Sequence, residues 1–108
     1  HCDFVMGVPG GMPGTADALV AAVSALPDAV TSWSATGIGR STLSVALAAL
    51  SKGGNLRVGM EDVLTLAKGV PVEHNAQLVE RAVALGRLAQ REPMSCDEAR
   101  ELLQIKRR

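Results

Sequence analysis

The sequence predicts an α/β fold in which parallel strands alternate with helices. The main observation is that short apolar runs of strand length are each followed by a Gly-containing turn and then by a segment with apolar residues at helical spacing. A second observation is the composition: 47% of the 108 residues are hydrophobic but only 2% are aromatic, so Leu, Val and Ala must build the core. A chain of this length corresponds to one small domain, and the alternating order favours βαβ units with right-handed crossovers.

The first unit starts with a short apolar run at residues 4–8, which we expect to be a buried strand. A Gly-rich loop opens at residues 9–11 and ends the strand. Thr15 is the expected N-cap of the following helix, whose apolar positions recur until Pro27 stops the pattern.

The second unit repeats this order. Residues 29–35 are predicted to contain a strand, with residues 36–39 as a turn. Residues 41–51 then form a helix, and the glycines at 53–54 close it.

The third unit begins with a strand at residues 56–60, and its helix begins at Asn75. The Ser-x-x-Glu sequence at residues 95–98 has the form of a capping box, which predicts one more helix over residues 99–105. We expect the three strands to be parallel neighbours in chain order, with helices on one face of the sheet.

The third strand has one polar face. Side chains alternate across a strand, so Arg57, Gly59 and Glu61 share the face opposite to three apolar residues, Leu56, Val58 and Met60. A central parallel strand normally buries both faces in apolar surroundings. Two interpretations remain open. In one, the polar face lines the interior of a barrel, close to the carboxyl-terminal end where active sites lie. In the other, the strand is an exposed edge with solvated charges.

Charge and cysteine content exclude several classes of function. Eleven basic and eleven acidic residues give a formal net charge of zero, so the basic footprint of a nucleic-acid or anionic-membrane binder is missing. The apolar run at residues 16–26 is shorter than the ~20 residues that a membrane-spanning helix needs. Cys2 and Cys96 have no metal-binding spacing and are expected to be buried, reduced thiols of a cytoplasmic protein.

The chain length limits the architecture. A closed (β/α)8 barrel takes about 250 residues, so this chain would hold less than half of one. An open doubly wound sheet is the alternative, and composition does not choose between the two. Because the sequence opens at His1 without an initiating Met, we expect it to be a piece of a longer protein.

Residues 53–62 read Gly-Gly-Asn-Leu-Arg-Val-Gly-Met-Glu-Asp. This block resembles the Gly-Gly-His-x-Arg-Val-Gly-x-Glu-Asp signature of the beta-keto acid cleavage enzymes. Further blocks stand in the order and spacing of that family, at residues 7–11, 37–40, 75–82 and 98–103. Asn55 replaces the usual His and Val63 a frequent Asn, and both departures adjoin the signature and bear on substrate preference.

The resemblance implies a zinc-dependent (β/α)8 TIM barrel that exchanges acyl groups between a beta-keto acid and acetyl-CoA, releasing acetoacetate and a new acyl-CoA. Residues 1–108 would then be the C-terminal portion of the barrel, with strands six to eight and the C-terminal helices, and the full-length enzyme a homo-oligomer. Carried over to this sequence, Glu61 is a zinc ligand, Asp62 is the catalytic base, and Arg57 holds that base in place.

These residue types suit the implied chemistry. Removal of a proton beside a carbonyl needs a base, and a neighbouring Arg favours the ionised form that a base requires. Glu61 and Asp62 are adjacent, so in a strand they are expected to point apart, one toward metal and one toward substrate. Catalytic zinc takes about three protein ligands, and the sequence has no His-x-His motif, so the other ligands are expected outside this chain. His74 is expected to be a solvated residue at a helix entrance.

The turn at Gly37, Gly39 and Arg40 has two possible uses. In barrels, loops near the last strands often hold a phosphate on backbone N–H groups, which would place a CoA phosphate beside Arg40. Alternatively, the glycines only permit a sharp strand-to-helix turn.

Two other functions remain open from the residues alone. One is a different barrel enzyme in which Glu61 and Asp62 bind Mg²⁺ and the substrate carries a phosphate. The other is a non-catalytic half-barrel that assembles with a partner through its sheet edges.

Overall fold

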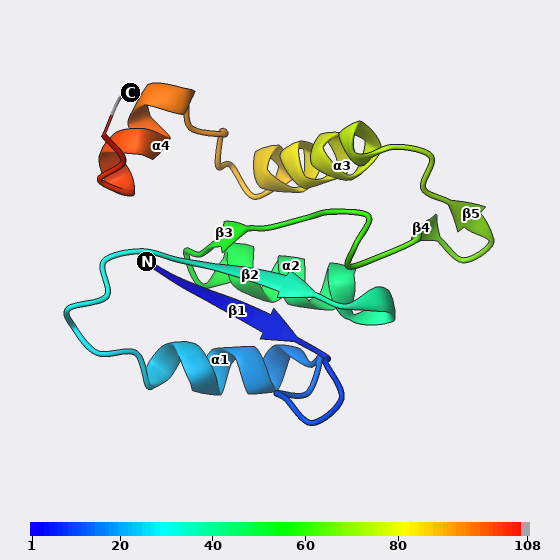
Figure 1. The fold of residues 1–108 in the computed structure, drawn as a ribbon, viewed down its shortest axis with the longest axis horizontal. Coiled ribbons are helices and arrows are strands. Elements are labelled where there is room, and N and C mark those ends of the chain that lie inside the picture. The colour runs from blue at the N-terminus through cyan, green and yellow to red at the C-terminus, as the bar shows by residue number, and fades with distance from the viewer. Residues whose placement is uncertain (107–108) are drawn as a thin grey trace.

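The computed structural model describes residues 1–106 as a layered α/β arrangement (Figure 1). The strands are β1 Cys2–Met6, β2 Trp33–Gly37, β3 Asn55–Leu56, β4 Thr65–Ala67 and β5 Val70–Pro71. The helices are α1 Ala16–Ser24, α2 Thr42–Ser51, α3 Asn75–Leu88 and α4 Cys96–Leu102, and a 3-10 turn, η1 Gly39–Ser41, precedes α2.

The main sheet has three parallel strands in the order β1-β2-β3, as the sequence predicts. The strand limits differ from the prediction. Strand β1 ends before Gly7, whose φ of +92° turns the chain away from the sheet. Residues 27–30 form a turn closed by the bond from the Val30 N–H to the Pro27 carbonyl (2.9 Å), so β2 begins only at Trp33.

Strand β3 is much shorter than the expected 56–60. The Arg57 N–H still donates to the Ala35 carbonyl (3.1 Å), which continues the ladder by one bond. The chain then turns, because the N–H groups of Asp62 and Val63 donate back to the Gly59 carbonyl (3.0 and 3.3 Å). The acidic pair of the signature therefore lies in a turn just beyond the sheet.

Helices α1 and α2 both pack on one face of the sheet, as predicted. Alternation brings Met6 of β1 and Ala35 of β2 to this face, where they meet the fully buried Leu19 of α1 and Val45 of α2. Further residues of the same face complete the cluster; these are Phe4, Trp33 and Leu56. The rings of Phe4 and Trp33 meet edge to face with centroids 5.8 Å apart.

The helix ends follow the predicted signals. The Thr15 hydroxyl accepts from the Ala18 N–H (3.2 Å) and caps α1. Beyond α2, Gly53 takes a φ of +81° and the Gly54 N–H donates to the Ala49 carbonyl (2.9 Å). The capping box predicted at residues 95–98 is confirmed at the start of α4, but the predicted limits of 99–105 are wrong: the helix begins directly after its Ser95 cap, at Cys96, and ends at Leu102.

A second apolar cluster joins the segment after β3 to α3. Its buried residues are Val63, Val72 and Leu78, with Val58 and Met60 packed against them. The β4–β5 hairpin contributes to this cluster and was not predicted, because its strands are only two or three residues long and mostly exposed.

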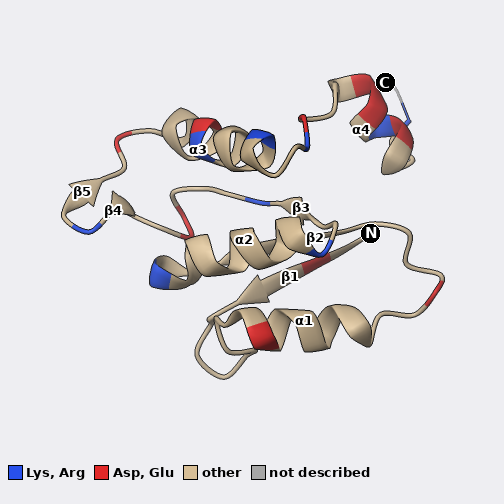
Figure 2. Ribbon diagram, turned by 180° about the vertical axis from the view of Figure 1, so that it is seen from behind, with Lys and Arg blue, Asp and Glu red and all other residues tan. Residues whose placement is uncertain are grey.

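Charged residues are unevenly distributed among the helices. Figure 2 shows them on α3 and α4, whereas α2 has none. None of the described helices is long and apolar enough to cross a membrane. Both cysteines are free thiols, but the expectation that both are buried is wrong: Cys96 is exposed because α4 buries none of its residues.

Candidate active site

The face of the sheet opposite α1 and α2 carries a row of polar side chains. Alternation places Asp3 of β1 and both Ser34 and Thr36 of β2 on this face, and the register puts Asp3 directly beside Ser34. The Ser34 hydroxyl donates to Asp3 Oδ1 (2.6 Å). Ser34 and Thr36 are both buried, with exposed fractions of 8% and 2%.

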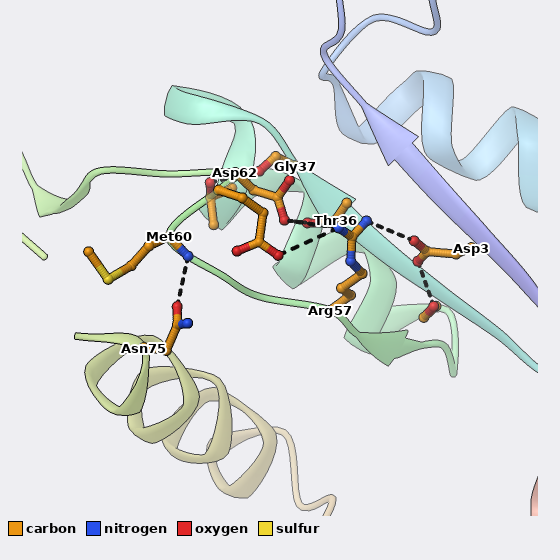
Figure 3. Close-up of polar contacts among 10 residues, drawn as sticks. Asp3, Thr36, Gly37, Arg57, Met60, Asp62 and Asn75 are labelled. Carbon is orange, nitrogen blue, oxygen red and sulfur yellow. Dashed lines mark hydrogen bonds and ion pairs between the residues drawn. The ribbon is translucent and has the colours of Figure 1, made fainter.

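Arg57 connects this row to the acidic turn (Figure 3). Its Nη1 donates to Asp3 Oδ2 (3.2 Å), and its Nη2 lies 3.6 Å from Asp62 Oδ2 and 3.7 Å from Glu61 Oε1. The hydrogen bond to Asp3 and the negative charge of Asp62 raise the pKa of the Arg57 guanidinium above its ordinary value. Arg57 is therefore a permanent cation shared by three carboxylates.

Asp62 is the best-fixed carboxylate of the group. The Thr36 hydroxyl donates to its Oδ2 (3.3 Å), and the Gly39 N–H donates to its backbone carbonyl (2.7 Å). Only 9% of the Asp62 side chain is exposed. A carboxylate held by a cation and a hydroxyl, and largely shielded from water, has the chemistry of a positioned proton acceptor.

The expectation that Glu61 and Asp62 point apart is wrong. Both carboxylates face Arg57 Nη2, because these residues lie in a turn and not in a strand. The Glu61 carboxylate folds back over Gly59, where any Cβ would clash with it. Its side chain is 62% exposed, so it remains open to a further ligand.

Zinc does not fit the described residues on their own. Within residues 1–106, no group of three or more His, Cys, Asp or Glu side chains is placed to hold a metal ion. Glu61 could offer one carboxylate, whereas a catalytic zinc takes about three protein ligands. His74 lies exposed at the start of α3, as expected for a helix entrance.

The turn after β2 is tightly packed. A Cβ on Gly37 would lie 2.5 to 2.8 Å from backbone atoms of Ser41 and Thr42. Gly39 has a φ of +56°, and its N–H is already bonded to Asp62. The Arg40 side chain is exposed and makes no hydrogen bond or ion pair with the other described residues. The Arg40 side chain is therefore accessible to a ligand, whereas the Gly39 N–H already donates to the Asp62 carbonyl in the acidic turn.

Four site residues were missed by sequence reasoning. Asp3, Ser34 and Thr36 approach Arg57 and Asp62 from neighbouring strands, and the His1 ring lies within hydrogen-bond distance of Ser34 Oγ (3.1 Å). Their signal was the alternation of polar and apolar residues in β1 and β2. Alternation alone does not say which strand positions are opposite one another.

The start of α3 also belongs to the site's surroundings. Asn75 Oδ1 accepts from the Met60 N–H (2.8 Å), which ties the first residue of α3 to the acidic turn (Figure 3). This bond and the apolar cluster that includes Met60 and Val63 fix the turn against α3.

Comparison with known proteins indicates the family of this chain. The sequence profile of the beta-keto acid cleavage enzyme family matches residues 1–105. Two proteins named 3-keto-5-aminohexanoate cleavage enzyme, from Fusobacterium nucleatum and Acetoanaerobium sticklandii, are each 39% identical to this chain, over 107 and 105 residues. These alignments cover 99% and 97% of this chain and 38% of each relative.

A further relative is a 3-dehydrocarnitine:acetyl-CoA trimethylamine transferase of Rhizobium meliloti, 38% identical over 103 residues. That alignment covers 95% of this chain and 34% of the relative. The chain thus spans little more than a third of the length of the curated relatives it matches. These matches confirm the resemblance carried by residues 53–62.

Proposed function

This chain belongs to the beta-keto acid cleavage enzyme family, and from that membership we propose that the complete enzyme exchanges acyl groups between a beta-keto acid and acetyl-CoA. The names of the relatives support both parts of the proposal. Two relatives are cleavage enzymes for a 3-keto acid, and a third is named as an acetyl-CoA-dependent transferase. The released products are acetoacetate and a new acyl-CoA.

The observation that carries the proposal is the fixed Asp62 carboxylate beside Arg57. Carbon–carbon cleavage of this kind starts with removal of a proton, which needs an ionised base held in one orientation. Asp62 accepts that proton, and its contacts with Thr36 and Arg57 hold the carboxylate in place. Because Arg57 stays charged throughout, its attraction for the Asp62 carboxylate, 3.6 Å away, helps to keep that carboxylate in one orientation.

We propose Glu61 as one carboxylate ligand of a zinc ion whose other ligands come from residues outside this chain. The exposed Glu61 side chain, within 3.7 Å of Arg57 and next to Asp62, supports this placement. The exposed Arg40 side chain is the proposed contact for a CoA phosphate, since it lies in the turn that is bonded to Asp62.

The proposed architecture is the C-terminal portion of a (β/α)8 barrel, with β1, β2 and β3 as its sixth, seventh and eighth strands. Two features support it. Helices α1 and α2 cover one face of a parallel sheet, and the opposite face carries a polar row that leads to the acidic turn beyond the carboxyl end of β3. In such a barrel the polar face lines the interior.

We also propose a cytoplasmic, homo-oligomeric enzyme. Two free thiols suit a reducing compartment. Exposed apolar residues on the outer side of α2, Leu43 and Leu47, suit contact with another subunit. Sedimentation of the full-length protein tests the oligomer, and a monomer at all concentrations would contradict it.

The roles are tested by Asp62→Asn and Glu61→Gln in the full-length enzyme, with Asp28→Asn and Glu101→Gln as exposed controls. We expect Asp62→Asn to lower acetoacetate release by about 10² to 10⁴, the usual worth of a general base, with bound zinc unchanged. Glu61→Gln should instead lose zinc. Near-normal turnover of Asp62→Asn would remove the proposed base, and full zinc retention by Glu61→Gln would remove the proposed ligand.

A further inference from the structure

Asp3 is the charged residue that β1 places on the polar face, and it lies 54 positions from Arg57 in the sequence. Its two oxygens have different partners: Oδ1 accepts from the Ser34 hydroxyl (2.6 Å), and Oδ2 accepts from Arg57 Nη1 (3.2 Å). Ser34 is itself buried, and its Oγ also lies 3.1 Å from His1 Nε2. The Asp3 carboxylate is thus held by the sheet through Ser34, independently of its contact with the Arg57 guanidinium.

The two terminal nitrogens of Arg57 have different partners. Nη1 is held by Asp3, and only Nη2 reaches the acidic turn, at 3.6 Å from Asp62 and 3.7 Å from Glu61. The Arg57 side chain is 43% exposed and carries several rotatable bonds, so its orientation needs a fixed partner. Asp3 is the charged group that provides one from the sheet side.

We propose that Asp3 is a positioning residue for the cleavage reaction, acting through Arg57 to hold the guanidinium against Asp62. This inference rests on the proposed function. A simpler role for the same contact is mechanical, in which the ion pair only joins β1 to the segment after β3 across β2. The two roles differ in the quantity that changes when Asp3 is replaced: a positioning role lowers the kcat of the folded enzyme, whereas a mechanical role lowers only its stability.

The experiment is a double-mutant cycle in the full-length enzyme with Asp3→Asn, Arg57→Gln and the double variant, and Asp28→Asn as a matched exposed control. We expect Asp3→Asn to lower kcat by about 10 to 100-fold, the effect of a small misplacement of a reacting group. KM should change little, because the interaction is made with the catalytic side chain and not with substrate. In the Arg57→Gln background, Asp3→Asn should cause no further loss.

Each outcome decides the matter. An unchanged kcat for Asp3→Asn, or an equal loss in both backgrounds, would overturn the positioning role in an enzyme whose wild type is active. An inactive wild type would instead overturn the proposed function, and this inference with it. If Asp3→Asn does not fold, Ser34→Ala keeps the negative charge of Asp3 and removes the hydroxyl that donates to its Oδ1. A loss of kcat in Ser34→Ala that vanishes in the Arg57→Gln background again supports the positioning role of Asp3.

Discussion

Arg57 is surrounded by three carboxylates, so its immediate environment carries more negative than positive charge. Such a group is favourable only if the acids are otherwise supported by hydrogen bonds or solvent. Glu61 is solvated, Asp3 accepts from a hydroxyl, and Asp62 accepts from Thr36. The hydroxyls of β2 therefore let two acids approach one cation at the edge of the sheet.

Thr36→Val tests the contribution of the hydrogen bond between the Thr36 hydroxyl and Asp62. The substitution keeps the shape of a side chain that is 2% exposed but removes the donor to Asp62. We expect unfolding free energy to fall by about 1 to 3 kcal/mol, since a mostly buried carboxylate loses a hydrogen bond. Denaturant unfolding measures the change, and Thr31→Val, on an exposed threonine of the preceding loop, is the control. Equal stabilities of the two variants would show that the Thr36 bond contributes nothing.

At the scale of elements, the junction between β2 and α2 depends on a close backbone approach at Gly37. The Thr42 hydroxyl donates to the Gly37 carbonyl (2.8 Å), and no space remains for a Cβ. Gly37→Ala should therefore shift the start of α2 and destabilise the fold by about 1 to 3 kcal/mol or more, as overpacking does. Gly11→Ala is the control, because its Cβ would meet nothing closer than 3.3 Å. A thermal midpoint for Gly37→Ala as high as that of the control would contradict the packing argument.

Helix α4 should be sensitive to acid. The Ser95 N–H and hydroxyl both donate to Glu98 Oε2 (2.8 Å each), and these bonds hold the pKa of Glu98 below its ordinary value of 4.5. A lowered pKa in the folded state means that the stabilisation is complete above about pH 4.5 and is lost as the pH falls through the lowered pKa.

Glu98→Gln keeps a capping side chain without a titratable group, so acidification should fray its α4 less than that of the wild type. Amide hydrogen exchange of α4 across the acidic range measures the difference. Glu101→Gln, on an exposed acid of the same helix, is expected to behave as wild type. The Asp97–Arg100 ion pair is present in all three proteins and cancels in the comparison. Identical acid profiles for wild type and Glu98→Gln would contradict the assignment.

Local signals predicted the helices because a cap or an apolar repeat involves residues only a few positions apart, as at Thr15 and Ser95. The limits of the strands were predicted less well. Strand β3 ends at Leu56, opposite Ala35, although β2 continues to Gly37. The apolar residues Val58 and Met60 lie beyond the strand and pack in a separate cluster with α3. Periodicity could not show whether these apolar residues pack against the sheet or against α3.

At the scale of the whole molecule, the site combines neighbours in sequence with residues far apart in it. Arg57, Glu61 and Asp62 were predictable together because they stand within six positions of one block. Asp3, Ser34 and Thr36 were not, because only the register of β1 on β2 and of β2 on β3 brings them to the block. The helix-covered face is a continuous apolar core, whereas the site face is polar.

The 108-residue chain by itself should not bind zinc tightly or turn over substrate. Within residues 1–106 Glu61 is the proposed ligand, and no group of three or more candidate ligands is assembled around it. Catalytic zinc requires about three protein ligands and is held weakly by a single carboxylate. The measurement is zinc content after dialysis together with acetoacetate release, made on this chain and on the full-length enzyme side by side. We expect zinc and turnover in the full-length enzyme only, and Glu61→Gln should leave the zinc content of the short chain unchanged. One tightly held zinc ion per short chain, lost on Glu61→Gln, would show that the residues present here assemble the metal site without the rest of the protein.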